Sequence, residues 1–104
     1  MSGAQPQIGQ YKTVVLAEDG KTKVVYYDTA IVTFDKDAII LDTGGWWTRS
    51  TKARMNQASR QFDLGYQVHQ VLNSWVITFR RESHSFDTER VRLDRLTGRV
   101  TRLN

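Results

Sequence analysis

A change in hydrophobic periodicity around residues 43–57 constrains the fold of this chain more than any other feature. Before it, apolar and polar residues alternate, as in strands that bury one face. From Thr48 to Leu64, apolar residues recur at helical spacing. Two glycines and two tryptophans lead into this segment, Thr48 or Ser50 can cap its first turn, and Gly65 follows where helices often end. The sequence therefore predicts one helix between two groups of strands.

The predicted helix separates apolar and basic residues onto two faces. At about 100° per residue, a narrow apolar stripe forms that we expect to pack on a sheet. This stripe consists of Thr51, Met55, Ala58 and Phe62. The opposite face consists of Arg49, Lys52, Asn56 and Arg60. We expect that second face to meet water or a ligand.

The remaining segments are typical of strands separated by turns. Candidate strands before the helix are residues 11–16, 23–34 and 38–41. Asp28 interrupts the second of these, where we expect a bulge or bend. Candidate strands after the helix are residues 66–71, 75–79, a segment that begins at 85, and 90–94 with 99–103. The order βββ-α-ββ plus a C-terminal strand or hairpin predicts an α+β fold, with a single helix packed on a mainly antiparallel β-sheet.

Length and composition limit the class of protein. With 104 residues, 39% of them hydrophobic, the chain can form one core but not two. We expect residues 1–10 to be a flexible leader and residues 11–104 to form a single α+β domain. There are no cysteines, which excludes disulfides and Cys-based zinc sites. The longest apolar run, residues 38–41, is far shorter than a membrane span, so we expect a cytoplasmic protein without a membrane partner.

Positive charge is concentrated in the helix and in the C-terminal quarter. The net charge is +4, although residues 1–47 are net negative and residues 64–79 carry no charge. The excess falls in residues 48–63 and 80–104 and consists mostly of arginine, whose planar guanidinium suits phosphates and carboxylates. Such charge indicates either a polyanion partner or an ordinary solvated surface.

The arginines of residues 90–102 alternate with apolar residues, which allows two interpretations. A hairpin could expose a basic ribbon, with Arg92 and Arg99 as contacts, while burying its apolar side. Alternatively, the arginines protect an edge hairpin from aggregation, because charge on exposed strands prevents edge-to-edge pairing. Glu89 and Asp94 can pair with these arginines, which favours the second interpretation.

The inventory of catalytic residues is small. The only histidines are His69, within a predicted strand, and His84, in a polar segment. Four aspartates, Asp28, Asp35, Asp37 and Asp42, lie along neighbouring strands without a paired histidine, and the middle two suit a turn. The Gly-Gly segment lacks the glycine spacing and the Gly-Lys-Ser/Thr of a phosphate-binding loop. We therefore predict no enzymatic activity, no cofactor and no metal site.

Two motifs together carry a resemblance to known proteins. A valine-rich strand ends in Thr, a Thr-Gly-Gly-aromatic-x-Thr loop follows, and the helix reads Thr-Lys-x-Arg-Met-Asn; later, Tyr66, Val68 and Gln70 precede Trp75. This pattern, over residues 24–79, resembles a family of short proteins encoded by bacteriophages and other mobile elements. The resemblance implies a phage or mobile-element origin and a location in the bacterial host cytoplasm, rather than a mechanism.

Two functions fit these features. The first is nucleic-acid binding through the basic helix face and the Gly-Gly-Trp-Trp loop, because aromatic rings stack on bases and cations neutralise phosphates. The residues predicted to contact DNA or RNA are Trp46, Trp47, Arg49, Lys52, Asn56, Arg60, Arg92 and Arg99. We expect one of the two tryptophans to be buried and the other partly exposed. The alternative is a phage protein that binds and inhibits or redirects a host protein, with the exposed aromatic and arginine side chains as anchors.

Overall fold

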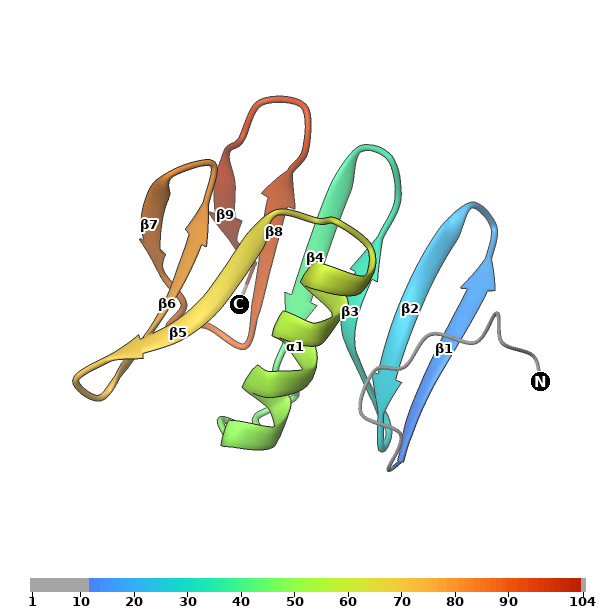
Figure 1. The fold of residues 1–104 in the computed structure, drawn as a ribbon, viewed down its shortest axis with the longest axis horizontal. Helices are drawn as coiled ribbons and strands as arrows, with labels where there is room; N and C mark the ends of the chain where they lie inside the picture. Colours follow the sequence, from blue (N-terminus) through green and yellow to red (C-terminus); the bar gives the residue numbers. More distant parts are fainter. Residues whose placement is uncertain (1–11, 104) are drawn as a thin grey trace.

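The computed structural model describes residues 12–103, so the leader predicted at residues 1–10 lies outside the described part of the chain. That part contains one helix and nine strands, which are labelled in Figure 1. In chain order the elements are β1 (Thr13–Glu18), β2 (Lys21–Tyr26), β3 (Thr29–Phe34), β4 (Ala38–Asp42), α1 (Arg49–Gln61), β5 (Tyr66–Val71), β6 (Ser74–Phe79), β7 (Glu82–Ser85), β8 (Arg90–Asp94) and β9 (Val100–Arg102).

The strands form two sheets in which every neighbouring pair is antiparallel. The larger sheet has the order β1-β2-β3-β4-β8-β9, and the smaller has the order β5-β6-β7. The chain builds the first four strands as a meander, passes through α1 and the small sheet, and then returns to add β8 beside β4 (Figure 1). Helix α1 therefore lies at the junction between the two sheets, where it contacts both β3 and β5.

One hydrophobic cluster joins the two sheets and the helix. In the large sheet, Val24, Val32, Leu41 and Val91 lie opposite one another across four strands, and all four are fully buried. Ile77, at the centre of β6, is fully buried from the small sheet. Burial of such side chains contributes about 1.5–3 kcal/mol each to folding.

The α+β fold with one helix packed on antiparallel strands is confirmed, but the predicted order is incomplete. Residues 23–34, predicted as one strand, form β2 and β3. Tyr27 adopts a left-handed φ of 56° and, with Asp28, makes a two-residue hairpin turn at the point where we expected a bend. The pairing of these strands does contain a bulge, but opposite Val24 and Val25. The strands form two sheets instead of the single sheet that the sequence predicts.

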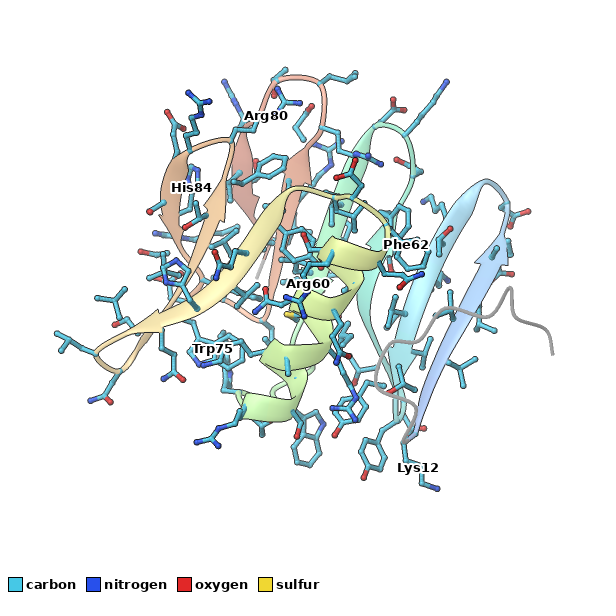
Figure 2. The ribbon with its side chains drawn as sticks, in the orientation of Figure 1. Lys12, Arg60, Phe62, Trp75, Arg80 and His84 are labelled. Atoms are coloured by element: carbon cyan, nitrogen blue, oxygen red, sulfur yellow. The ribbon has the colours of Figure 1, made fainter. Side chains whose placement is uncertain are left out.

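The predicted start and core stripe of α1 are confirmed. Thr48 is the N-cap, because its Oγ1 accepts a hydrogen bond of 3.2 Å from the Thr51 amide. Thr51, Met55 and Ala58 are fully buried, as the helical spacing predicts. Phe62, just after the helix, is only half-buried, and it packs on the large sheet beside β3 (Figure 2).

The helix ends at Gln61, before the glycine that we expected to mark its end. Asp63 is the first residue beyond it with a left-handed φ, of 55°, and Gly65 is the second, with a φ of 82°. No helix within residues 12–103 has the length and apolar character that crossing a membrane requires.

Candidate nucleic-acid interface

The helix face predicted to be free is partly used to hold β5. Asn56 donates from Nδ2 to the Val68 carbonyl and accepts from the Val68 amide at Oδ1, each at 2.8 Å. Ser59 does the same for Tyr66, donating to its carbonyl at 2.6 Å and accepting from its amide at 3.1 Å. These side chains thus satisfy main-chain groups along the edge of the small sheet, where a further strand would otherwise pair. The expectation of a free face is wrong at Asn56, whose amide nitrogen and oxygen both bond to the main chain of Val68.

The three cations of that face lie in different surroundings. Arg49, the first helical residue, is exposed, and its guanidinium has no partner among residues 12–103. Lys52 is half-buried: its Nζ donates to the Gln70 side chain at 2.6 Å and lies 5.4 Å from the centre of the Trp75 ring. Arg60 is also exposed, but it lies about 16 Å from Arg49 along the helix axis, at a rise of about 1.5 Å per residue. The structure therefore groups Arg49 and Lys52 with the tryptophan loop and leaves Arg60 at the far end of α1.

The Gly-Gly-Trp-Trp loop is fixed by short-range hydrogen bonds. The Asp42 carboxylate accepts from the Gly44 amide at 2.8 Å, and the Thr43 carbonyl accepts from the Trp46 amide at 2.8 Å. Gly44 has a φ of 61°, and a Cβ at this position would lie 2.5 Å from Oγ1 of Thr29. Glycine is required here both for the left-handed backbone and for this close approach. The loop therefore presents its tryptophans from a defined backbone.

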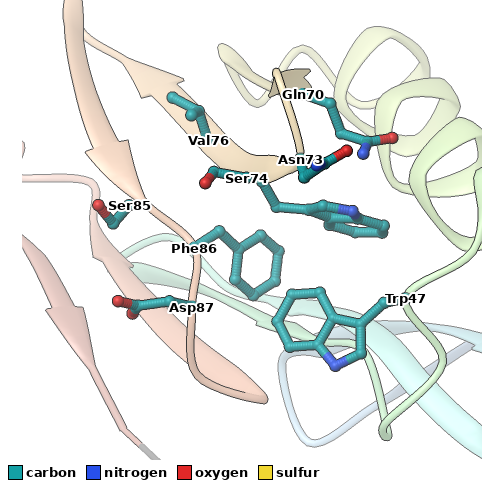
Figure 3. A pocket seen from close by; sticks show the side chains of 9 residues that line it. Trp47, Gln70, Asn73, Ser74, Val76, Ser85, Phe86 and Asp87 are labelled. Carbon is teal, nitrogen blue, oxygen red and sulfur yellow. The ribbon is translucent and has the colours of Figure 1, made fainter.

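Both tryptophans are exposed, so the expectation that one would be buried is wrong. Trp46 is 63% exposed and Trp47 is 41% exposed. The Trp47 ring packs edge-on against Trp75, with centroids 5.1 Å apart, and against Phe86 at 5.5 Å. Together these rings line a hollow of about 630 Å³, shown in Figure 3. Its remaining lining is mostly polar and comes from Gln70, Asn73, Ser74, Val76, Ser85 and Asp87.

Trp46 lines a second hollow, on the side of the loop that faces the β2–β3 turn. This hollow measures about 330 Å³, and its other lining residues are Tyr26, Tyr27, Thr29, Ile31, Thr48 and Ser50. The Arg54 guanidinium lies 4.4 Å from the centre of the Tyr26 ring and donates to the Thr13 hydroxyl at 2.9 Å. The described lining thus consists of aromatic rings, hydroxyls and one isoleucine, with a cation beside it and no carboxylate.

Arg92 and Arg99 do not join the tryptophans. The predicted alternation in the C-terminal quarter is confirmed in β8, where Leu93 is fully buried and Arg92 points to the opposite face of the sheet. Arg92 forms an ion pair of 3.3 Å with Asp94. The amides of Thr97 and Leu96 hydrogen-bond to the Asp94 carboxylate and, with Arg92, hold its pKa below the ordinary value. Arg99 is exposed in the turn before β9, facing β7.

The two histidines lie in the small sheet. His69 Nε2 lies 2.9 Å from the Thr78 hydroxyl. His84 Nε2 is buried without a hydrogen-bond partner among the described residues, and the nearest carboxylate oxygen, of Glu82, lies 3.8 Å away. Within residues 12–103, no group of three or more His, Asp or Glu side chains is arranged to hold a metal ion. What the described surface does provide is exposed aromatic rings with cations beside them.

Reasoning from the sequence missed several residues of the candidate interface. Trp75 is the second residue of β6 and fits an ordinary strand pattern, while Phe86 follows β7 in a polar segment. They contact Trp47 only because the chain returns from the small sheet to β8. Hydrophobic periodicity does not predict such contacts between distant segments. Tyr26 and Tyr27 carry a local signal, since two adjacent tyrosines precede a turn residue, but we interpreted them as part of one long strand.

Comparison with known proteins identifies the family. A family model described as "Kyanoviridae Gp96 protein" matches residues 3–98, which is most of the chain. No curated protein and no solved structure matches it. The family match confirms the phage origin that the sequence motifs implied, and it leaves the partner open. The chain belongs to the Kyanoviridae Gp96 protein family of bacteriophages.

Proposed function

We propose that this protein is a phage accessory protein that binds single-stranded nucleic acid in the cytoplasm of the infected host. In this proposal, bases stack on Trp46 and Trp47, and Arg49 and Lys52 neutralise the neighbouring phosphates. One observation carries it: two adjacent tryptophans diverge from a fixed loop, both exposed, each beside its own hollow, at the start of a helix whose first residues include Arg49 and Lys52. Asn56, Arg60, Arg92 and Arg99 are not part of the proposed contact.

Stacking on these rings requires bases that are not already stacked in a duplex. The edge contacts of Trp47 with Trp75 and Phe86 hold its ring in place while leaving part of it open to solvent. A ring that is already ordered loses little conformational freedom on binding, which favours affinity. Base–aromatic stacking contributes about 1–3 kcal/mol per base and tolerates any sequence. The geometry therefore favours a single strand, bound with little base preference.

The charges near the loop suit a phosphate backbone. The first turn of α1 contains no acidic residue, and its N-terminus carries a partial positive charge beside Arg49. Lys52 and Arg54 lie over aromatic rings of the two hollows, so a base stacked there brings its phosphate close to a cation. With about three phosphates neutralised and about 0.7 counterions released per phosphate, the affinity should fall with a log–log salt slope of about −2.

Fluorescence anisotropy with labelled oligothymidylate and oligouridylate of about 12 nucleotides, and with a duplex of equal length, tests this proposal. We expect both single strands to bind more tightly than the duplex and to weaken between about 50 and about 200 mM salt. Trp46→Ala should weaken binding about tenfold, with unchanged stability because the ring is exposed.

The matched charge variants are Arg49→Glu and Arg60→Glu, two exposed positions on the same helix. Arg49→Glu should reduce affinity severalfold more than Arg60→Glu, because Arg60 lies at the far end of α1. Equal effects of the two variants would show that affinity depends on the overall charge and not on a cation beside the tryptophan loop. If the wild-type protein binds none of the three oligonucleotides, the proposal is wrong, and the exposed rings then favour the host-protein alternative.

A further inference from the structure

The end of the β5–β6 hairpin carries an apolar residue whose backbone has an unusual conformation. Leu72 is 93% exposed, and the neighbouring Val71 is 53% exposed. Leu72 also has a φ of 59°, in the left-handed region that branched side chains rarely adopt. Glycine or asparagine would form this turn more easily and would expose less apolar surface. Folding alone therefore does not explain a leucine here.

The hairpin end lies beside the proposed base-stacking surface. Gln70, Asn73 and Ser74, which flank Leu72, line the same hollow as Trp47 (Figure 3). In Figure 1, the β5–β6 hairpin extends beyond the other strands toward the side where α1 begins. A single strand of nucleic acid that passes over Trp47 and through this hollow consequently runs toward Leu72.

The chemistry of the hairpin end suits the face of a base pair better than a phosphate backbone. Residues 64–79 contain no charged side chain, so this end adds nothing to electrostatic attraction. The flat faces of base pairs are the apolar surfaces of nucleic acid, and other proteins insert leucine or isoleucine wedges against them. The amides of Gln70 and Asn73 can meanwhile hydrogen-bond to the edges of unpaired bases.

We infer that Leu72 packs against the terminal base pair of a duplex, so that the preferred ligand is a junction between single-stranded and double-stranded nucleic acid. The unpaired strand leaves the junction through the Trp47 hollow, and the duplex ends at the hairpin tip. This inference rests on the proposed single-strand binding and specifies its substrate.

The test compares a single-stranded oligonucleotide with the same strand extended into a short duplex at one end. The wild-type protein should bind the junction about tenfold more tightly than the single strand. Leu72→Asn keeps a residue that tolerates the left-handed turn but removes the apolar surface. It should abolish the junction preference while leaving single-strand affinity and thermal stability unchanged or slightly higher. Leu96→Asn, at another turn leucine that is 71% exposed, is the matched control and should change neither affinity.

A second readout uses 2-aminopurine in the terminal base pair, whose fluorescence rises when the base frays and unstacks. Because Leu72 packs on the closed pair, the wild-type protein and Leu96→Asn should lower this fluorescence, and Leu72→Asn should not. Equal wild-type affinity for junction and single strand, or an unchanged junction preference in Leu72→Asn, would overturn this inference and leave single-strand binding standing. An equal loss of affinity for the single strand and for the junction in Leu72→Asn would overturn it as well, since Leu72 would then contact the single strand and not the duplex end. Absence of any wild-type binding to single strands would instead refute the proposed function itself.

Discussion

Replacing Asn56 by alanine tests whether this residue holds the fold together or contacts a ligand. In the structure, its amide makes two hydrogen bonds of 2.8 Å to the main chain of Val68, which is 1% exposed. Each bond contributes about 0.5–1.5 kcal/mol net, and a buried polar group left without a partner costs about 1–3 kcal/mol. Because Asn56 is only half-buried, water can replace part of what is lost.

We therefore expect Asn56→Ala to lower the free energy of unfolding by about 2–4 kcal/mol. Urea unfolding followed by circular dichroism measures this change, with an unchanged dependence on urea concentration if the folded state stays compact. The melting temperature should fall by about 10 °C or more, since about 1 kcal/mol shifts Tm by about 4–8 °C in a domain of this size. Gln61→Ala, at an exposed position of the same helix, is the control and should stay within about 0.5 kcal/mol of the wild type.

The result distinguishes two roles for the polar face of α1. If Asn56 served mainly as a ligand contact, alanine would leave stability intact and weaken oligonucleotide binding. A stability loss below about 0.5 kcal/mol would therefore refute the argument that Asn56 satisfies the edge of β5.

Three further changes probe the core and the loop. Tyr66→Phe should cost about 1–2 kcal/mol by removing the hydrogen bond of 2.6 Å from the Tyr66 hydroxyl to the Met55 carbonyl. Burial raises the pKa of Tyr66. The neutral side chain therefore stabilises the fold fully below the ordinary tyrosine pKa of about 10, and this stabilisation falls as the pH rises above that value. The urea midpoint should consequently decline less with rising pH in the variant than in the wild type. Phe62→Ala should cost about 1–3 kcal/mol in urea unfolding, less than a fully buried phenylalanine, because its side chain is only partly buried. Gly44→Ala should lower both Tm and oligonucleotide affinity, because the new Cβ would meet Thr29 at 2.5 Å and displace the tryptophan loop.

The local part of this fold could be predicted from the sequence. The helix start at Arg49 and the buried positions of Met55 and Ala58 follow from capping and spacing, which depend on neighbours within a few residues. The hairpin at Tyr27 and Asp28 was missed because a tyrosine with a positive φ contradicts ordinary turn preferences. In that case the tertiary context outweighs the local preference.

The arrangement of the two sheets could not be predicted in the same way. Hydrophobic alternation identifies which face of a strand is buried, but it does not say which strand lies alongside. β8 pairs with β4 across a gap that contains α1 and the whole small sheet. The same limit applies to α1: the wheel correctly places Asn56 opposite the core stripe, yet that side is covered by β5. A polar helix face is therefore no guarantee of a free surface.

The docking of α1 on β5 also links stability to the candidate site. Asn56 and Ser59 fix β5 beside the helix, and β5 carries Gln70 toward the first turns of α1, where Lys52 donates to it. The Trp47 hollow is lined by Gln70 near the end of β5 and by Trp47 just before α1, so its shape depends in part on the polar contacts that hold β5 against α1. A loosened β5 would widen the hollow without any change in a residue that touches the ligand. Binding defects in variants of this contact must therefore be measured per folded molecule before they are assigned to recognition, whereas defects in Trp46 and Leu72 variants report on recognition directly.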